Sequence, residues 1–161
     1  MNKVDIKAAV ITVSDTRKGG DDLSGNKLVE MLDSIGAEIL ERKIVSDDLV
    51  DLRETLHALA SSDDINLIVT TGGTGFGPRD NTPEATLAVI EREAPGMSEA
   101  MRRETAALHP MAMLSRGVCG IRGNTLIINL PGSPKGVAEC FDVIRPVLQH
   151  AINLICGNTR H

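Results

Sequence analysis

The chain has 161 residues, a length that suits one compact domain and is hardly enough for two. It contains two Phe and neither Trp nor Tyr, which argues against a protein that binds single-stranded nucleic acid by stacking bases on aromatic side chains. The net charge of -5 and the absence of a long basic run argue against nucleic acid or an anionic membrane as the main partner, although local features can still bind a small anion.

The sequence carries no sign of export or of a disulfide framework. The three cysteines fit no zinc or redox spacing, and we interpret them as small buried side chains in a reducing compartment. The N-terminal stretch lacks the features of a signal peptide, and no apolar stretch approaches the roughly 20 residues of a transmembrane helix. We therefore expect a cytoplasmic protein.

The first half of the chain alternates between strand and helix patterns. Residues 8–13 form a continuous run that is apolar except for Thr12, which is typical of a strand buried on both faces of a sheet. Apolar residues between Leu28 and Ile35 have helical spacing. Ser24 can cap the N-terminus of this helix, and Gly36 suits its C-terminal end. A second strand, a second helix and a third strand are predicted at 38–45, 49–59 and 67–71.

The second half continues the alternation. Thr82-Pro83-Glu84 has the pattern of a helix start with Thr82 as the cap, and Leu87 and Ile90 are expected to face inward. A further helix is predicted around 97–108, after Pro95-Gly96 breaks the chain.

The last third predicts an antiparallel pair and a long helix. Strands at 118–121 and 125–130 are joined through Gly123-Asn124, which indicates a tight hairpin. The last helical pattern covers 137–155 and contains Pro146, so we expect a kink or two consecutive helices. The pattern predicts one layered α/β domain spanning residues 1–161, with a mostly parallel sheet.

Four polar loops are expected to meet at one edge of this sheet, because ligands of open α/β sheets bind beyond the carboxyl ends of the strands. They are rich in Gly, Ser, Thr and Asp and cover 14–16, 46–48, 71–80 and 131–135. This convergence predicts a single ligand-binding crevice.

The glycine-rich loop after the third strand suits a phosphate. Gly72, Gly73 and Gly75 would let the backbone approach a ligand and aim N–H groups at its oxygens, while Thr71 and Thr74 add hydroxyl donors. The loop has neither the Walker A pattern nor the dinucleotide fingerprint. A glycine-rich turn without any ligand is the alternative.

Two acids from different loops, Asp47 and Asp80, form a candidate Mg²⁺ site, since Mg²⁺ is held by one or two carboxylates together with substrate phosphates. The alternative for Asp47 is a cap of the helix at 48–60, which does not exclude metal binding. The alternative for Asp80 is a solvated loop acid or a surface partner of Arg79.

The loop after the last strand also suits an anion. Ser133 and Pro134 predict a helix N-terminus after Gly132, to which Lys135 could add positive charge; an ordinary strand-to-helix turn is the alternative. No Ser, His and acid are spaced as a catalytic triad, and we interpret most methionines as core residues. The histidines are interpreted as surface or packing residues: His57, His109, His150 and His161. These residues fit phosphoryl or nucleotidyl transfer, which needs positioning and metal but no protein nucleophile.

Ordered motifs from about residue 7 to 156 resemble the MoaB/Mog-type molybdopterin adenylyltransferases. The most specific is TTGGTGFGPRDNTPEAT at 70–86. The others are VSDT at 13–16, DDLSG at 21–25, APGMSEAM at 94–101, MLSR at 113–116, GIRGNTLIINLPGSPKG at 120–136 and AEC at 138–140. The resemblance implies a three-layer α/β/α sandwich that assembles as a homotrimer or homohexamer.

The resemblance also implies a reaction. The terminal phosphate of molybdopterin attacks the α-phosphate of ATP with Mg²⁺ as cofactor, and pyrophosphate leaves. The two essential acids and metal ligands correspond to Asp80 and Asp47, with Asp48 as the neighbouring alternative for the second. The implied nucleotide and pterin contacts are Ser14, Thr71, Gly72, Gly73, Thr74, Gly75, Ser115, Pro131, Gly132, Ser133 and Lys135.

Two other hypotheses stay open. The protein could be a carrier or oligomeric scaffold that holds molybdopterin without adenylylating it, although the acids at 47 and 80 favour activity. It could also be an unrelated nucleotide-binding enzyme such as a dehydrogenase, against which the missing fingerprint counts. We expect the protein to lack the metal-insertion domain that is fused in eukaryotic relatives, and a separate protein to receive the product, whether the metal is molybdenum or tungsten.

Overall fold

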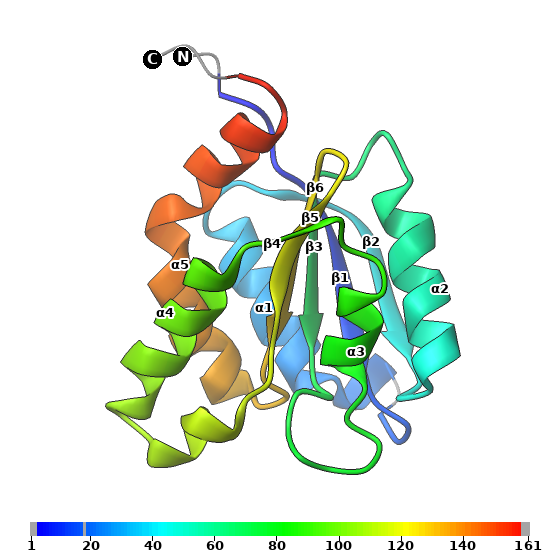
Figure 1. Cartoon of the computed structure of the whole chain (residues 1–161), viewed down its shortest axis with the longest axis vertical. Helices are drawn as coiled ribbons and strands as arrows, with labels where there is room; N and C mark the ends of the chain where they lie inside the picture. Colours follow the sequence, from blue (N-terminus) through cyan, green and yellow to red (C-terminus); the bar gives the residue numbers. More distant parts are fainter. Residues whose placement is uncertain (1–2, 18, 159–161) are drawn as a thin grey trace.

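The computed structural model describes residues 3–17 and 19–158. Within them one six-stranded sheet has the order β2-β1-β3-β6-β5-β4, with helices on both faces (Figure 1). The strands are β1 (Lys7–Val13), β2 (Glu38–Val45), β3 (Leu67–Thr71), β4 (Arg92–Glu93), β5 (Cys119–Arg122) and β6 (Thr125–Leu130). The helices are α1 (Leu23–Asp33), α2 (Leu49–Ala60), α3 (Thr82–Leu87), α4 (Pro95–Ala106) and α5 (Pro134–Ile155), with the short 3₁₀ helices η1 (Gly19–Asp21) and η2 (Pro110–Leu114).

The sheet is mostly parallel, as predicted. β1 pairs in parallel with β2 and β3, and β3 pairs in parallel with β6. β5 runs antiparallel to β6 and β4 antiparallel to β5, which confirms the hairpin. The sequence did not predict β4, because a strand of two residues is too short to show an alternating pattern.

The core has two layers, one on each face of the sheet, and β1 is buried between them. Ala8 and Val10 pack with residues of α1, α4 and α5, whereas Ala9 and Ile11 pack with residues of α2 and α3. Phe141 of α5 is the largest fully buried side chain and lies in the first layer. This arrangement confirms the three-layer α/β/α sandwich and directs the loops after β1, β2, β3 and β6 to one end of the sheet.

Three helix starts differ from the prediction. Asp22 caps α1 by accepting a hydrogen bond from the Gly25 N–H at 3.0 Å, so Ser24 lies inside the first turn. Asp48, and not Asp47, caps α2. Thr82 is the first residue of α3, and its hydroxyl donates to the Gly72 carbonyl at 2.8 Å. In each case the contact depends on how the loop turns, which residue type alone does not specify.

Two further expectations were wrong or only partly met. Leu87 is 47% exposed, because the apolar residues buried here are Ala85 of α3 and Val89 of the turn that follows it, beside the partly buried Ile90. α5 continues as one helix through Pro146, so the alternative of two consecutive helices does not occur. Pro146 lies on the exposed side, where water can satisfy the carbonyl that a missing N–H leaves free.

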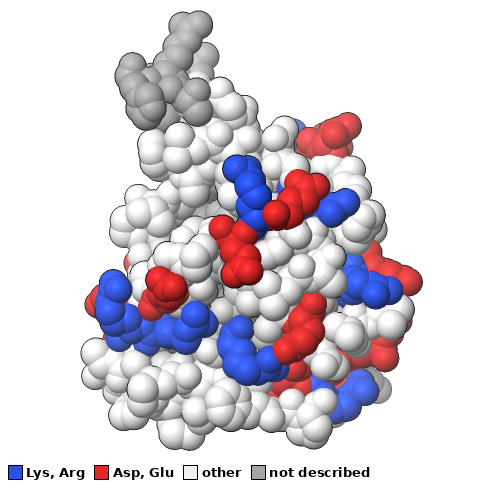
Figure 2. Space-filling view, in the orientation of Figure 1, with Lys and Arg blue, Asp and Glu red and all other residues white. Residues whose placement is uncertain are grey.

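On the face shown in Figure 2, Lys and Arg are interspersed with Asp and Glu. The lower left of this view, where η2 lies in Figure 1, is uncharged, and residues 105–115 contain no Lys, Arg, Asp or Glu. No helix in the described part of the chain has the length and apolar character needed to cross a membrane.

Candidate active site

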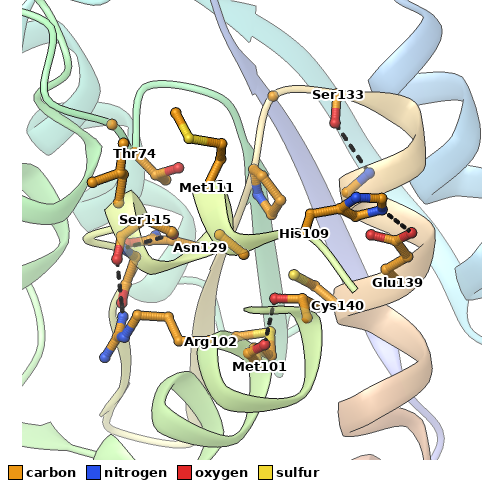
Figure 3. A pocket seen from close by; sticks show the side chains of 18 of the residues that line it. Thr74, Met101, Arg102, His109, Met111, Ser115, Asn129, Ser133, Glu139 and Cys140 are labelled. Carbon is orange, nitrogen blue, oxygen red and sulfur yellow. Dashed lines mark hydrogen bonds and ion pairs between the residues drawn. The ribbon is translucent and has the colours of Figure 1, made fainter. Parts of the chain in front are cut away.

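A pocket of about 640 Å³ opens at the carboxyl ends of β3 and β6 (Figure 3). One side, here named the loop wall, consists of residues from the loops after these strands and the first turn of α5, namely Gly73, Thr74, Gly75, Asp80, Pro131, Gly132, Ser133, Lys135 and Gly136. The opposite side, the helix wall, comes from α4, η2 and the second turn of α5, which contributes Glu139 and Cys140. The pocket brings together many of the predicted residues, which are Gly73, Thr74, Gly75, Asp80, Ser115, Pro131, Gly132, Ser133 and Lys135.

Thr71 and Gly72 do not line the pocket. Their hydrogen-bond donors instead join the end of β3 to the end of β6 and the loop after it. The Thr71 hydroxyl donates to the Pro131 carbonyl at 2.7 Å, and the Gly72 N–H donates to the Leu130 carbonyl at 3.1 Å. Gly72 has a φ of 102°, and a Cβ there would lie 2.5 Å from the Val13 carbonyl oxygen. The two residues therefore shape the loop wall, and their donors are used within the protein.

Asp80 is held by its own loop. Its Oδ2 accepts a hydrogen bond from the Gly77 N–H at 2.9 Å. Arg116, which precedes β5, donates through Nε to the Gly75 carbonyl at 2.8 Å and through Nη2 to the Asp80 carbonyl at 2.7 Å. Its guanidinium also pairs with Glu84 and thereby lowers the pKa of that carboxyl. Sequence reasoning missed Arg116 as a loop-wall residue although it ends the MLSR motif.

Asp47 lies behind the glycine-rich loop and does not line the pocket. Its Oδ1 would be 3.3 Å from a Cβ placed on Gly73, so the carboxylate lies against this loop. Burial raises the pKa of Asp47, and the negative charges of Asp15 and Asp80 act in the same direction. Asp48 points elsewhere and accepts hydrogen bonds from the first N–H groups of α2.

Asp15 connects two of the loops. Its carboxylate accepts two hydrogen bonds from Arg79, which lower the pKa of Asp15. Asp15 and Asp47 also form two reciprocal hydrogen bonds, in which the backbone N–H of each residue donates to the carboxylate of the other. The predicted alternative of an Asp80–Arg79 pair is therefore wrong, since adjacent loop residues point to different partners.

Ser14 is part of a tight turn and does not line the pocket. Its hydroxyl accepts hydrogen bonds from the N–H groups of Thr16 and Arg17, at 3.3 and 3.1 Å. Arg17 then reaches across to the Gly132 carbonyl at 3.0 Å and also donates to the Ser24 hydroxyl. Ser14 thus shapes the loop from which Arg17 contacts the loop after β6.

The N-terminus of α5 completes the loop wall. Ser133 caps the helix by accepting a hydrogen bond from the Gly136 N–H at 3.0 Å (Figure 3). The exposed Lys135 ammonium lies 3.9 Å from the Glu139 carboxylate. A helix N-terminus beside a cation favours a bound anion.

The helix wall contains residues that the sequence did not indicate. His109 Nε2 lies 3.1 Å from the Glu139 carboxylate, and Met111 is 72% exposed beside it (Figure 3). His109 therefore lines a candidate site, and Met111 and Met113 are exposed instead of filling the core. Cys140 is the buried thiol expected, and burial raises its pKa to about 11. The irregular stretch around η2 has no periodic pattern from which these contacts could be predicted.

The two acids fit Mg²⁺ by their chemistry. Within the described residues, no group of three or more His, Cys, Asp or Glu could hold a metal. Asp47 and Asp80 instead flank the glycine-rich loop, since Asp80 Oδ2 would lie 2.9 Å from a Cβ on Gly75 and Asp47 Oδ1 3.3 Å from one on Gly73. One or two carboxylates together with phosphate oxygens are the donor set that Mg²⁺ uses on nucleotides, and each acid keeps one oxygen, Oδ1, outside the backbone hydrogen bonds described above.

Comparison with known proteins agrees with the motifs. The family model described as a probable molybdopterin binding domain matches residues 9–150. The molybdopterin adenylyltransferase of Helicobacter pylori strain J99 is 40% identical over 157 residues, covering 95% of this chain and 89% of that protein. The molybdenum cofactor synthesis protein cinnamon of Drosophila melanogaster is 42% identical over 153 residues, or 93% of this chain, which spans only 26% of that longer protein.

Solved structures give the same result. The molybdopterin biosynthesis enzyme MoaB from Thermus thermophilus is 41% identical, with a TM-score of 0.87 and coverage of 94% of this chain and 97% of that one. The tungsten cofactor synthesizing protein MoaB from Pyrococcus furiosus is 31% identical, with a TM-score of 0.82 and coverage of 94% and 97%. The chain therefore belongs to the family of molybdopterin-binding domains of the MoaB/Mog type.

Proposed function

We propose that the protein is a molybdopterin adenylyltransferase, which transfers AMP from Mg²⁺-ATP to the terminal phosphate of molybdopterin. The observation that carries the proposal is the loop wall, where a glycine-rich loop, Asp80 and the N-terminus of α5 line one pocket. Relatives with this named activity match 95% of the chain at 40% identity.

The reaction needs no protein nucleophile. An oxygen of the terminal phosphate of molybdopterin forms a bond to the α-phosphorus of ATP. The bond from that phosphorus to the oxygen bridging to the β-phosphorus breaks, and its electron pair leaves with pyrophosphate. Because the attacking group is already an anion, the main barrier is repulsion between two anions together with the charge that develops on the leaving group.

The residues of the loop wall address this barrier. The positive end of α5, capped by Ser133 and flanked by Lys135, attracts phosphate oxygens. The backbone around Gly73 and Gly75 lets a phosphate approach closely. Asp47 and Asp80 would hold Mg²⁺, which when bound supplies positive charge to the triphosphate.

The helix wall contributes apolar contacts. Met101, Met111 and Leu114 present apolar surface to the pocket opposite the glycine-rich loop. Such side chains suit the flat heterocycles that both substrates carry, and methionine adapts to their outline. The groups proposed to act on the phosphates thus lie in the loop wall, and most of the apolar contacts come from the helix wall, which also carries Arg102, His109 and Glu139.

The test is direct detection of the product. Purified protein is incubated with molybdopterin, ATP and Mg²⁺, and adenylylated molybdopterin is measured by mass spectrometry. Asp80→Asn and Asp47→Asn are each expected to lower turnover by roughly 100-fold or more, because a charge that acts on the transition state is lost. Asp48→Asn is the matched control: asparagine still caps α2, so near-wild-type turnover is expected.

Two outcomes would reject parts of this proposal. Near-wild-type turnover in both Asp80→Asn and Asp47→Asn would remove the two acids from the reaction. A wild-type protein that binds molybdopterin but forms no product would instead favour the carrier or scaffold hypothesis.

We propose further, from the family resemblance, that the protein is cytoplasmic, acts as a homotrimer or homohexamer, and passes its product to a separate metal-insertion protein. Sedimentation equilibrium would distinguish a trimer from a hexamer, and a monomer at micromolar concentration would contradict both.

A further inference from the structure

We infer that Arg79 and Asp15 form a positioning pair that fixes Asp47 and Asp80 relative to each other. The inference rests on the proposed function, because it gives the pair a purpose only if these two acids serve one reaction. Neither Arg79 nor Asp15 lines the pocket, so neither is proposed to touch a substrate.

The first link is a two-point contact between loops. Arg79 donates through Nε to Asp15 Oδ2 at 2.8 Å and through Nη2 to Asp15 Oδ1 at 3.0 Å. Two parallel hydrogen bonds between a guanidinium and a carboxylate fix orientation as well as distance. The contact joins the loop after β3, which carries Asp80, to the loop after β1.

The second link joins Asp15 to Asp47. The Asp47 N–H donates to Asp15 Oδ1 at 3.0 Å, and the Asp15 N–H donates to Asp47 Oδ2 at 2.9 Å. Oδ1 of Asp15 therefore accepts from both Arg79 and Asp47. This reciprocal contact fixes the backbone of Asp47 and one oxygen of its carboxylate, and leaves Oδ1 beside Gly73.

The third link closes the connection on the other side of Asp80. Asn81 donates through Nδ2 to the Asp47 carbonyl at 2.9 Å. Asp80 thus lies between two residues, Arg79 and Asn81, that are both tied to the Asp47 segment, one of them through Asp15. A shift of either loop would change the separation of the two acids.

Stability alone does not account for the pair. The side chains of Arg79 and Asp15 are 57% and 37% exposed, and ion pairs with such exposure contribute little to folding. The acids around it repel one another, since the charges of Asp15 and Asp80 both raise the pKa of Asp47 while Arg79 lowers it. We therefore assign the Arg79–Asp15 contact the geometric role of holding the two acids in place.

The alternative is that Arg79 turns away from Asp15 to contact the triphosphate directly. The two roles predict opposite effects of losing Asp15. In the positioning role, Asp15→Asn weakens the metal–nucleotide site. In the direct role, the same change frees Arg79, and binding is unchanged or tighter.

The experiment measures binding of Mn²⁺ with α,β-methylene-ATP by calorimetry, so no turnover is needed. Arg79→Ala and Asp15→Asn are each expected to weaken binding by about 10-fold, as changes to residues that orient metal ligands do. The double variant should also lose only about 10-fold, because the two residues act as one unit. Arg79→Lys should behave like Arg79→Ala, since an ammonium cannot make both contacts.

The matched control is Asp142→Asn on α5. Asp142 pairs with Arg145 at 2.9 Å and is also exposed, but the pair lies outside the pocket. Its removal should leave binding unchanged. Melting temperatures of all variants verify that the fold is intact, and the two conservative changes keep the test valid if Arg79→Ala unfolds.

The outcomes separate this inference from the proposed function. If Asp47→Asn weakens binding but Arg79→Ala and Asp15→Asn do not, only the positioning pair is rejected. A double variant that loses about 100-fold would reject it too, because the residues would then act independently. Full binding by Arg79→Lys would reject the geometric role. If Asp47→Asn itself binds like wild type, the metal site of the proposed function fails instead.

Discussion

The two walls of the pocket are built in different ways. In the loop wall, Thr71 joins the two loops and Arg116 bonds to two carbonyls of residues 75–80, so the backbone is held by many directed contacts. In the helix wall, η2 exposes Met111 and Met113, and the contact of His109 with Glu139 ties its beginning to α5. The groups proposed to act on the phosphates, Asp80 and Lys135, thus lie on the wall that directed hydrogen bonds hold, while the opposite wall supplies methionine and leucine surface beside Arg102, His109 and Glu139.

The largest effect should come from breaking the loop wall at Gly72. In Gly72→Ala, the new Cβ meets the Val13 carbonyl at 2.5 Å, and the φ of 102° is unfavourable for alanine. We expect the free energy of unfolding to fall by about 2–4 kcal/mol, from backbone strain and overpacking together. Urea denaturation measures this change, and turnover should fall with it because both loops shift.

Gly96→Ala is the control for that change. Gly96 lies in the first turn of α4, and a Cβ there meets nothing within 4 Å. The helix should be unchanged or more stable by up to about 1 kcal/mol. A Gly72→Ala variant that is as stable as Gly96→Ala would mean that the Gly72 conformation is not required.

A smaller effect is expected from the helix wall at Met111. Met111→Ala removes apolar surface that lines the pocket, but the side chain is 72% exposed, so stability should stay within about 0.5 kcal/mol. The KM for one of the two substrates should rise by about 5-fold, the loss expected for roughly 1 kcal/mol of apolar contact, with kcat unchanged. Steady-state kinetics with each substrate varied measures the split.

Met113→Ala is the matched control, because Met113 is 66% exposed on the same 3₁₀ helix but does not line the pocket. It should leave both KM values unchanged. A drop in kcat for Met111→Ala, or the same rise in KM for Met113→Ala, would contradict a helix wall that contributes only shape.

The two walls also differ in how far the sequence predicts them. The strands other than β4 were predicted within a residue or two, because residues 8–13 and 67–71 are mostly apolar, β-branched runs that only a doubly covered sheet buries. Once the strands were placed, their carboxyl ends located the loop wall. The helix wall was not predicted, because Met111 and the buried Met101 have the same side chain and differ only in how α4 and η2 pack.

Within the loop wall, the sequence indicated residue types better than roles. Asp47 and Asp48 are indistinguishable as neighbours, and only the direction of the turn makes Asp48 the cap of α2. Arg79 was considered as the partner of Asp80, yet its partner Asp15 is 64 residues away and no local pattern connects them. Contacts between distant loops depend on the assembled sheet, so they follow from the structure alone.

The smallest effect tests whether charge helps to hold the loop wall. Arg116 lowers the pKa of Glu84, and a carboxyl with a lowered pKa stabilises the fold above its unfolded pKa of about 4.3. This stabilisation is lost as pH falls through the lower, folded pKa. Because the Arg116 and Glu84 side chains are 35% and 45% exposed, we expect less than about 1 kcal/mol.

The measurement compares the wild type with Glu84→Gln by urea denaturation between pH 7 and about pH 3, where the carboxyl becomes protonated. The difference in unfolding free energy should be constant near neutrality and shrink in acid. In an Arg116→Gln background the difference should be smaller at every pH, because the guanidinium that lowers the pKa of Glu84 is absent. A difference that grows towards acid would mean that the Glu84–Arg116 contact opposes folding, and the rigidity of the loop wall would then rest on its backbone hydrogen bonds alone.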